Sequence, residues 1–172
     1  MISFIVSKPS INDCREIVSI ANEVYFETEK EFWNEGYYRI STQECLNYIN
    51  EGKIIVAKLN NQVVGFVLSG PKSEFTFEFS MLTTDFNYQK KGVGKLLVNE
   101  VFKRAKKKGF KYLEIEVLTP KYWTHSQKEF LTIWYTSIGF KFVETFSFES
   151  KYPSHLKFQK CELEFKRYKK RL

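Results

Sequence analysis

The sequence contains little cysteine and little histidine, and neither residue is clustered. Its three cysteines, Cys14, Cys45 and Cys161, form no CxxC pair and are odd in number. This pattern argues against a disulfide framework and favours a reducing compartment such as the cytoplasm. The two histidines, His125 and His155, have no metal-ligand spacing around them, so no metal site is expected.

Long apolar runs and secretory features are also lacking. No run reaches membrane-spanning length, and residues 1–7 lack the basic flank and the length of a signal peptide. We therefore expect a cytoplasmic protein that does not engage a membrane. A Gly-x-Ser-x-Gly nucleophile elbow is absent as well, which argues against a serine hydrolase.

The residues that are present suit a folded enzyme-sized domain. The 172 residues are 43% hydrophobic and 17% aromatic, a composition typical of one domain spanning residues 1–172. The net charge is +7, and basic residues concentrate at 103–108 and 166–172. We interpret these runs as a solvated helix end and a basic tail, so nucleic acid is not the expected partner. The composition is compatible with a monomer or a homodimer.

Hydrophobic periodicity alternates between the spacing of strands and that of helices. Strands are expected at residues 2–6, 53–59, 62–69, 75–84, 112–118, 140–148 and 159–165. Capping boxes predict helix starts at Ser10, Ser41 and Ser126, and a fourth helix follows the glycines at 92–94. The order β-α-α-β-β-β-α-β-α-β-β predicts an α/β fold with a mixed sheet covered by helices.

The most informative stretch is Tyr-Gln-Lys-Lys-Gly-Val-Gly-Lys at residues 88–95, between an expected strand and an expected helix. Backbone N–H groups at the start of such a helix, together with its dipole, form an anion site, and phosphate is the expected guest. A P-loop would need glycine at Gln89 and a hydroxyl residue at Leu96. A dinucleotide fingerprint would need a small residue at Leu97. Neither pattern is met.

The pattern Gln89-x-x-Gly92-x-Gly94 resembles the pyrophosphate loop of the GNAT family of N-acetyltransferases, which bind acetyl-CoA. Three further segments are similar to family motifs and follow in the family's order. They are Leu82-Thr83-Thr84 at the end of the fourth strand, Leu96-Leu97 in the next helix, and residues 134–140, which resemble Tyr-x-x-x-Gly-Phe. The resemblance covers the chain from end to end and implies the acyl-CoA N-acyltransferase fold.

The resemblance implies that the chain is an acetyltransferase whose acetyl donor is acetyl-CoA, with no metal involved. Pantetheine would add like a strand beside the fourth strand, and the pyrophosphate would bind the amides of the glycine turn. The residues implied in donor binding are Leu82, Thr83, Thr84, Gln89, Lys90, Lys91, Gly92, Val93, Gly94 and Lys95.

The resemblance also implies a direct transfer of acetyl to an amine. A backbone N–H near Leu82 would stabilise the oxyanion formed on the thioester carbon. Tyr135, four residues before Gly139, holds the position of the family's general acid. For the general base, Glu116 on the fifth strand and Glu78 on the fourth are alternatives, and water can serve instead.

The acceptor is expected to be the primary amine of a small molecule or of a protein or peptide. Tyr37 and Tyr38 in an aromatic loop, and Trp123 in an extended connection, are expected to line its pocket. Where family members often carry asparagine against pantetheine, this chain departs from the pattern with Lys128. The alternative function is a non-catalytic acyl-CoA-binding or nucleic-acid-binding module on the same fold.

Overall fold

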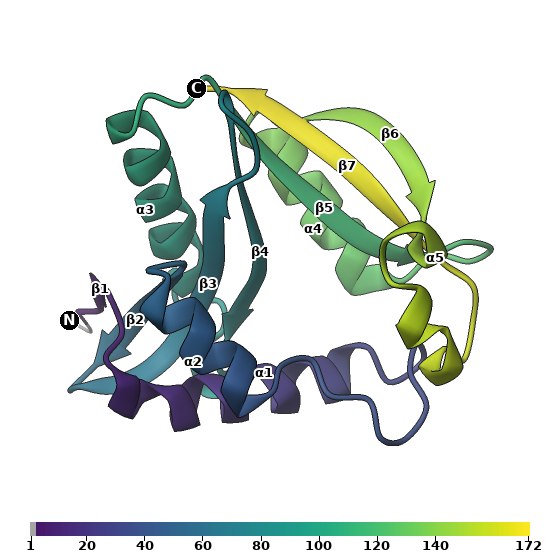
Figure 1. The fold of residues 1–172 in the computed structure, drawn as a ribbon, viewed down its shortest axis with the longest axis horizontal. Helices are drawn as coiled ribbons and strands as arrows, with labels where there is room; N and C mark the ends of the chain where they lie inside the picture. Colours follow the sequence, from purple (N-terminus) through teal and green to yellow (C-terminus); the bar gives the residue numbers. More distant parts are fainter. Residues whose placement is uncertain (1–2) are drawn as a thin grey trace.

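The computed structural model describes residues 3–172, in which seven strands form one mixed sheet in the order β1-β2-β3-β4-β5-β7-β6 (Figure 1). The strands are β1 (Ile5–Ser7), β2 (Ile54–Leu59), β3 (Gln62–Pro71), β4 (Thr76–Thr84), β5 (Tyr112–Pro120), β6 (Lys141–Ser147) and β7 (Leu163–Arg171). The helices are α1 (Cys14–Thr28), α2 (Thr42–Asn50), α3 (Val93–Lys107), α4 (Ser126–Ser137) and the short α5 (Phe148–Lys151). Within residues 3–172, no helix combines the length and the apolar character needed to cross a membrane. The predicted α/β fold and its order of elements are confirmed, with α5 as an addition.

Helices cover both faces of the sheet around β2 and β3, whose residues are buried on both sides, whereas β6 is largely exposed. On one face α3 inserts Leu97 and Val101 into a core that also receives residues of α4. On the other face Ile17 of α1 and Cys45 of α2 pack against Phe66 of β3. The apolar stripes predicted for α1 and α3 are therefore the faces that cover the sheet.

The last strand differs from the prediction. Residues 166–172, expected as a basic tail, continue β7 to Arg171 between β5 and β6. Its cations lie opposite carboxylates of β5: Arg167 Nη2 is 3.0 Å from Glu116, and Lys169 Nζ is 3.9 Å from Glu114. Opposite charges on neighbouring strands stabilise a sheet. The expectation of a tail is therefore wrong for these residues.

Two of the three predicted capping boxes are present. The Ser41 hydroxyl accepts from the Glu44 N–H at 3.2 Å, and the Ser41 N–H donates to the Glu44 carboxylate at 2.8 Å. The Ser10 N–H likewise donates to the Asp13 carboxylate at 2.7 Å. The third box is wrong, because α4 starts at Ser126 itself and the residue before it provides no side-chain cap.

Candidate functional site

The sheet opens between its two parallel strands, β4 and β5. Their pairing ends at Glu78 and Glu114, and beyond these residues the two described strands diverge (Figure 1). The edge of β4 that faces the opening therefore offers unpaired backbone groups, which an extended amide chain can satisfy. The space between residues 79–82 and 115–118, bounded also by Tyr135 of α4, is called the splay hollow below.

A bulge in β4 interrupts the strand beside this hollow. Met81 and Leu82 stand against the single residue Val67 of β3, and Met81 has a φ of +50°. A non-glycine residue in this left-handed region costs about 1–3 kcal/mol and persists only where the surroundings enforce it. The bulge frees the peptide around Leu82 from the regular ladder, so its N–H is available to a partner in the hollow.

The start of α3 follows β4 and lies beside the splay hollow. A Cβ built on Gly94 would lie 4.0 Å from the Leu82 side chain, so the first turn of α3 lies next to the end of β4. Gly92 is the N-cap, with a φ of +87°, and no side chain caps the helix. The first intrahelical bond runs from the Leu96 N–H to the Gly92 C=O at 3.1 Å. The N–H groups of residues 93–95 are thus without intrahelical partners and form an anion site with the helix dipole.

The side chains of the glycine turn hold its shape and add positive charge. Gln89 Nε2 donates to the Thr84 C=O at 3.3 Å and so ties the turn to the end of β4. Lys91 Nζ donates to a backbone carbonyl of the preceding turn at 2.8 Å. Lys90, with a φ of +60°, and Lys95 are exposed. The backbone amides and the lysines predicted to bind phosphate therefore lie together at one helix start.

Tyr135 and Glu116 reach the splay hollow from opposite faces of the sheet. Tyr135 belongs to the core on the α3 and α4 side, where its ring lies 5.9 Å from that of Phe79. Glu116 follows Ile115 on β5, so its side chain points to the other face, where it contacts Lys151 of α5. Burial raises the pKa of Tyr135, so its hydroxyl keeps its proton at neutral pH.

Glu116 is held by several cations. Lys151 Nζ contacts one carboxylate oxygen, while Lys72 Nζ and Arg167 Nη2 lie 3.1 and 3.0 Å from the other. Burial acts to raise the pKa of Glu116, but Lys151 and Lys72 outweigh it and hold the pKa below its ordinary value. Glu78, the other candidate base, is 43% exposed, lies 3.5 Å from Lys72 and does not line the splay hollow. Within residues 3–172, no group of three His, Cys, Asp or Glu side chains is placed to hold a metal ion.

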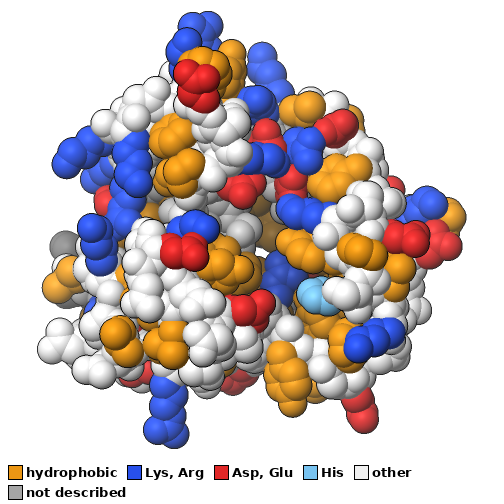
Figure 2. All heavy atoms as spheres, in the orientation of Figure 1, with side chains coloured by type: hydrophobic (Ala, Val, Ile, Leu, Met, Phe, Trp, Pro, Cys, Tyr) orange, Lys and Arg blue, Asp and Glu red, His pale blue; other side chains and the backbone are white. Residues whose placement is uncertain are grey.

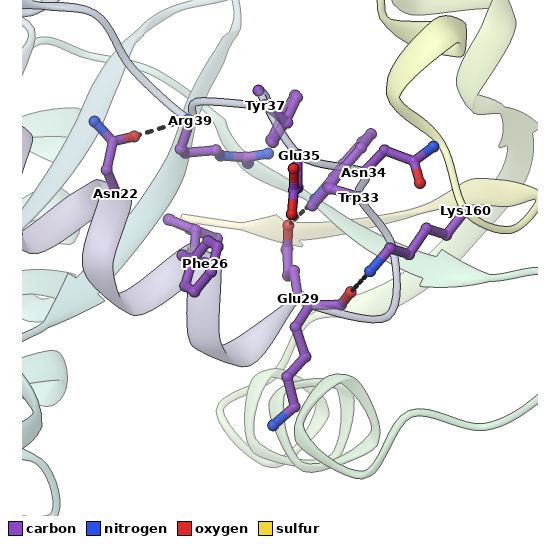
Figure 3. A pocket seen from close by; sticks show the side chains of 12 residues that line it. Asn22, Phe26, Glu29, Trp33, Asn34, Glu35, Tyr37, Arg39 and Lys160 are labelled. Atoms are coloured by element: carbon purple, nitrogen blue, oxygen red, sulfur yellow. Dashed lines mark hydrogen bonds between the residues drawn. The ribbon is translucent and has the colours of Figure 1, made fainter.

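A second hollow lies at the C-terminal end of α1 and is called the α1 hollow below. Its walls include Trp33 and Tyr37 from the loop after α1 (Figure 3). In the same orientation as Figure 1, Figure 2 shows the molecule indented near its centre, over the opening between β4 and β5. Tyr25, Glu29 and Arg39 line both hollows, so the two are contiguous. The α1 hollow thus leads into the splay hollow, and molecules bound in the two would meet at these three residues.

Glu29 is a buried carboxylate at the junction of the hollows, with a side chain only 1% exposed. Lys128 Nζ lies 2.5 Å from one of its oxygens, and Trp33 Nε1 donates to the other at 2.8 Å. Burial acts to raise the pKa of Glu29, but Lys128 and Arg39 outweigh it and hold the pKa below its ordinary value. Lys128, which departs from the family pattern, therefore forms an ion pair with Glu29 at the end of α1.

Of the three residues predicted to line the acceptor pocket, only Tyr37 lines one of the two hollows. Tyr37 lines the α1 hollow and stacks on Trp33, with ring centroids 4.0 Å apart. Tyr38 is 74% exposed, and Trp123 is 43% exposed and packs edge-on against Phe32. Neither Tyr38 nor Trp123 lines either hollow. The tryptophan that lines the α1 hollow is Trp33.

Sequence reasoning missed Tyr25, Glu29 and Arg39. A signal existed for Glu29, which lies four residues after Tyr25 and so on the continuation of an otherwise apolar helical stripe. Arg39 reaches the junction only because the loop folds back along α1, where the Asn22 side chain accepts from the Arg39 N–H at 2.8 Å. No local pattern predicts that contact.

Comparisons with known proteins agree with this geometry. The Acetyltransferase (GNAT) family model matches residues 15–125, more than half of the chain, whereas no curated protein sequence matches. The PaiA N-acetyltransferase of Thermoplasma acidophilum, solved with coenzyme A, is 21% identical over 99% of each chain, with a TM-score of 0.75. An N-acetyltransferase of Staphylococcus aureus Mu50 is 18% identical over 97% of each chain, with a TM-score of 0.72. The yncA protein of Salmonella typhimurium, solved with its cofactor acetyl-CoA, is 19% identical over 98% of this chain and 94% of that one, with a TM-score of 0.72.

The solved structures share the fold, and the family match covers much of the part of the chain that forms the site. Residues 15–125 include α1, the opening between β4 and β5, and the glycine turn, whereas Tyr135 lies just beyond the match. The chain belongs to the GNAT family and is an acetyl-CoA-dependent acetyltransferase.

Proposed function

We propose that the protein transfers acetyl directly from acetyl-CoA to the primary amine of a small molecule. The observation that carries this proposal is the junction of two hollows at the opening of the sheet, with Tyr135 on one face and Glu116 on the other. The donor would lie along β4 with its pyrophosphate at the start of α3. The acceptor would enter through the α1 hollow and meet the thioester at the junction.

The chemistry assigns a separate task to each side of the opening. The amine nitrogen attacks the thioester carbon and forms a C–N bond, and the N–H near Leu82 stabilises the resulting oxyanion. The C–S bond then breaks, and the sulfur leaves with the electron pair. Tyr135 gives its proton to the sulfur, while Glu116 or a water takes the proton of the amine and passes it to solvent, from which Tyr135 is reprotonated. The products are an acetamide and coenzyme A with a free thiol.

A small acceptor is favoured because the loop after α1 is tied to the segment before β7. The Asn34 N–H donates to the Phe158 C=O at 2.6 Å, and the Lys160 N–H donates to the Phe32 C=O at 2.8 Å. The Lys160 ammonium also donates to the Lys30 C=O at 3.0 Å. These bonds bridge one side of the α1 hollow and obstruct a path along which an extended peptide could run.

The direct test of the proposal is a screen of amine acceptors with acetyl-CoA, followed through release of free thiol. Small amines, polyamines and short peptides with free N-termini should be included, and mass spectrometry should identify the acetylated product. Turnover with small amines in preference to peptides supports the proposal. Tight coenzyme A binding with no turnover on any amine would instead favour the non-catalytic module.

The glycine turn is tested by Gly94→Glu, which is expected to weaken acetyl-CoA binding by about tenfold to a hundredfold. Gly94 lies in a regular helical turn, and a Cβ there meets nothing closer than the Leu82 side chain at 4.0 Å. A carboxylate at a helix start is compatible with the dipole, but here it would occupy the phosphate site and repel the pyrophosphate. Gly92 is a poorer choice, because a side chain at its φ of +87° adds backbone strain.

Asn99→Glu is the matched control, because it adds the same charge on the exposed surface of α3. Calorimetric titration with acetyl-CoA should show a Kd close to wild type for Asn99→Glu. An unchanged Kd for Gly94→Glu as well would contradict the assignment of the phosphate site.

The general base is tested by comparing Glu116→Gln with Glu78→Gln. We expect Glu116→Gln to lower kcat by about 10²-fold, the low end for a positioned base, because its low pKa makes it a weak proton acceptor. Glu78→Gln removes a carboxylate from the neighbouring strand outside the hollow and should change kcat by less than about twofold. Steady-state kinetics and melting curves of both variants decide the matter, and near-wild-type kcat in both would assign the base to water.

A further inference from the structure

Arg39 is a charged residue at the junction to which the proposed chemistry gives no task. Its side chain lines both hollows and extends toward the wall that carries Glu29 and Trp33 (Figure 3). Its Nε is buried and makes no hydrogen bond. Across residues 3–172, no carboxylate oxygen lies within 4.0 Å of its guanidinium nitrogens. A guanidinium is always charged in proteins, so Arg39 is a cation that has no carboxylate of these residues in ion-pair contact, although Glu29 acts on its charge from beyond 4.0 Å and the Tyr37 side chain interacts with it.

No neighbour among the described residues forms a direct ion pair with Arg39, although Glu29 and Tyr37 act on its charge. The Glu29 carboxylate is already bonded to the Lys128 ammonium at 2.5 Å and to the Trp33 indole at 2.8 Å. The ring of Tyr25 lies 4.5 Å from the guanidinium carbon and contributes a cation–π contact, which carries no net charge. Buried charges in proteins are ordinarily paired, since an unpaired one is costly. The unpaired cation therefore points to a partner supplied by a ligand.

The charges around the α1 hollow favour an anion. Lys30, Arg39 and Lys160 line it with the carboxylates Glu29 and Glu35, but Lys30 is paired with Glu27 at 3.1 Å and Glu29 is paired with Lys128 at 2.5 Å. Arg39 and Lys160 then stand against Glu35, which leaves one positive charge in excess. The excess of positive charge in a concave site raises the local concentration of an anionic ligand.

We infer that the acceptor is an amino carboxylate, whose carboxylate pairs with Arg39 and whose amine points into the splay hollow. This inference rests on the proposed function and names its substrate class. The planar guanidinium donates two parallel bonds to a carboxylate, which fixes the orientation of the whole molecule. The stacked rings of Trp33 and Tyr37 lie beside this anchor and suit an apolar or aromatic side chain on the acceptor.

The inference is tested with sets of acceptors that differ only at the carboxylate. L-phenylalanine, its carboxamide and phenethylamine form one set, and L-methionine, its carboxamide and the corresponding decarboxylated amine form another. Without recognition of the carboxylate, the carboxamides should react faster, because more of their amine is unprotonated at neutral pH. With Arg39 as the anchor, the amino acids should have the higher kcat/KM, by about tenfold to a hundredfold.

Two variants isolate Arg39. Arg39→Gln should remove the preference for the carboxylate and leave the kcat/KM of the decarboxylated amines within about threefold. Arg39→Lys keeps the charge without the planar fork and should retain part of the preference. Lys30→Gln is the matched control, because it removes one cation from the exposed rim of the same hollow and should leave the preference intact.

Calorimetric titration of L-phenylalanine into the protein with coenzyme A provides a readout that does not depend on turnover. Binding that Arg39→Gln abolishes and Lys30→Gln preserves supports the inference. Acetylation of all amines without preference, or a preference that survives Arg39→Gln, overturns the inference and leaves the proposed function standing. If no amino acid binds or reacts, the inference is overturned, and the polyamine and peptide acceptors then decide the proposed function separately.

Discussion

Tyr135→Phe is expected to lower kcat by about 10² to 10⁴ while the affinity for acetyl-CoA stays close to that of the wild type. This loss corresponds to about 3 to 5 kcal/mol at the transition state. The substitution keeps the ring and its packing against Phe79 and Phe140, with centroids 5.9 and 5.8 Å away, and removes only the hydroxyl. Burial raises the pKa of Tyr135, so the wild-type residue holds its proton throughout the neutral range and can give it to the departing sulfur.

Tyr25→Phe is the matched control for this prediction. It removes a hydroxyl from the same junction, but from a residue on α1, and keeps the ring that lies beside Arg39. We expect its kcat to stay within about threefold of wild type, below the range for a positioned acid. Steady-state kinetics, melting curves and acetyl-CoA titrations should be measured on both variants. A Tyr135→Phe protein that melts differently but turns over at the wild-type rate would make Tyr135 a core residue only.

The fold could be predicted because its signals lie within single elements. The apolar stripes of α1 and α3, the glycine turn and the alternating residues of β5 are local patterns that need no partner. The C-terminal half of β7 could not be predicted in this way. Its run of basic residues has little apolar alternation, and its place in the sheet depends on ion pairs such as those of Arg167 with Glu116 on β5 and Glu144 on β6.

The candidate site likewise has one part that local motifs predict and another that depends on contacts between distant segments. The glycine turn and Tyr135 lie in contiguous motifs, so the sequence alone was enough to single them out. Arg39 and Glu29 come together only when the loop after α1 folds back, and the same fold brings Trp33, which the sequence did not single out, to the wall of the α1 hollow. Lys128 could be recognised as a departure from the family pattern. Its partner could not, because the contact with Glu29 joins α4 to the end of α1 across the opening of the sheet.

The Glu29–Lys128 pair is expected to give the largest effect on stability. Lys128→Met removes the cation 2.5 Å from a buried carboxylate and leaves Trp33 as the hydrogen-bond donor to Glu29. Breaking one side of a buried ion pair costs about 3–5 kcal/mol of the free energy of unfolding, because the remaining charge stays buried. Replacing both partners, as Glu29→Leu with Lys128→Met, should recover most of that loss, since apolar groups can fill the space.

The pH dependence of this effect has a definite sign. In the wild type the folded-state pKa of Glu29 lies below its ordinary value of 4.5, so the pair stabilises fully above that pH. Its contribution is lost as the pH falls through the lowered folded-state pKa. In Lys128→Met, the ammonium that lowers the pKa of Glu29 is gone, so burial raises this pKa. The folded variant therefore takes up a proton as the pH falls toward 4.5. The destabilisation by Lys128→Met should therefore be largest at neutral pH and shrink on acidification.

Urea unfolding of the wild type, the single variants Glu29→Leu and Lys128→Met, and the double variant, at pH 7 and at pH 5, measures both the coupling and its pH dependence. Lys30→Met is the control, because the Lys30–Glu27 pair is exposed and should contribute less than about 1 kcal/mol. A loss below about 1 kcal/mol for Lys128→Met at pH 7, the range of an exposed pair, would show that the contact does not behave as a buried one. A loss that is equally large at both pH values would instead assign it to the packing of the Lys128 side chain, because only the ionised Glu29 makes the effect depend on pH.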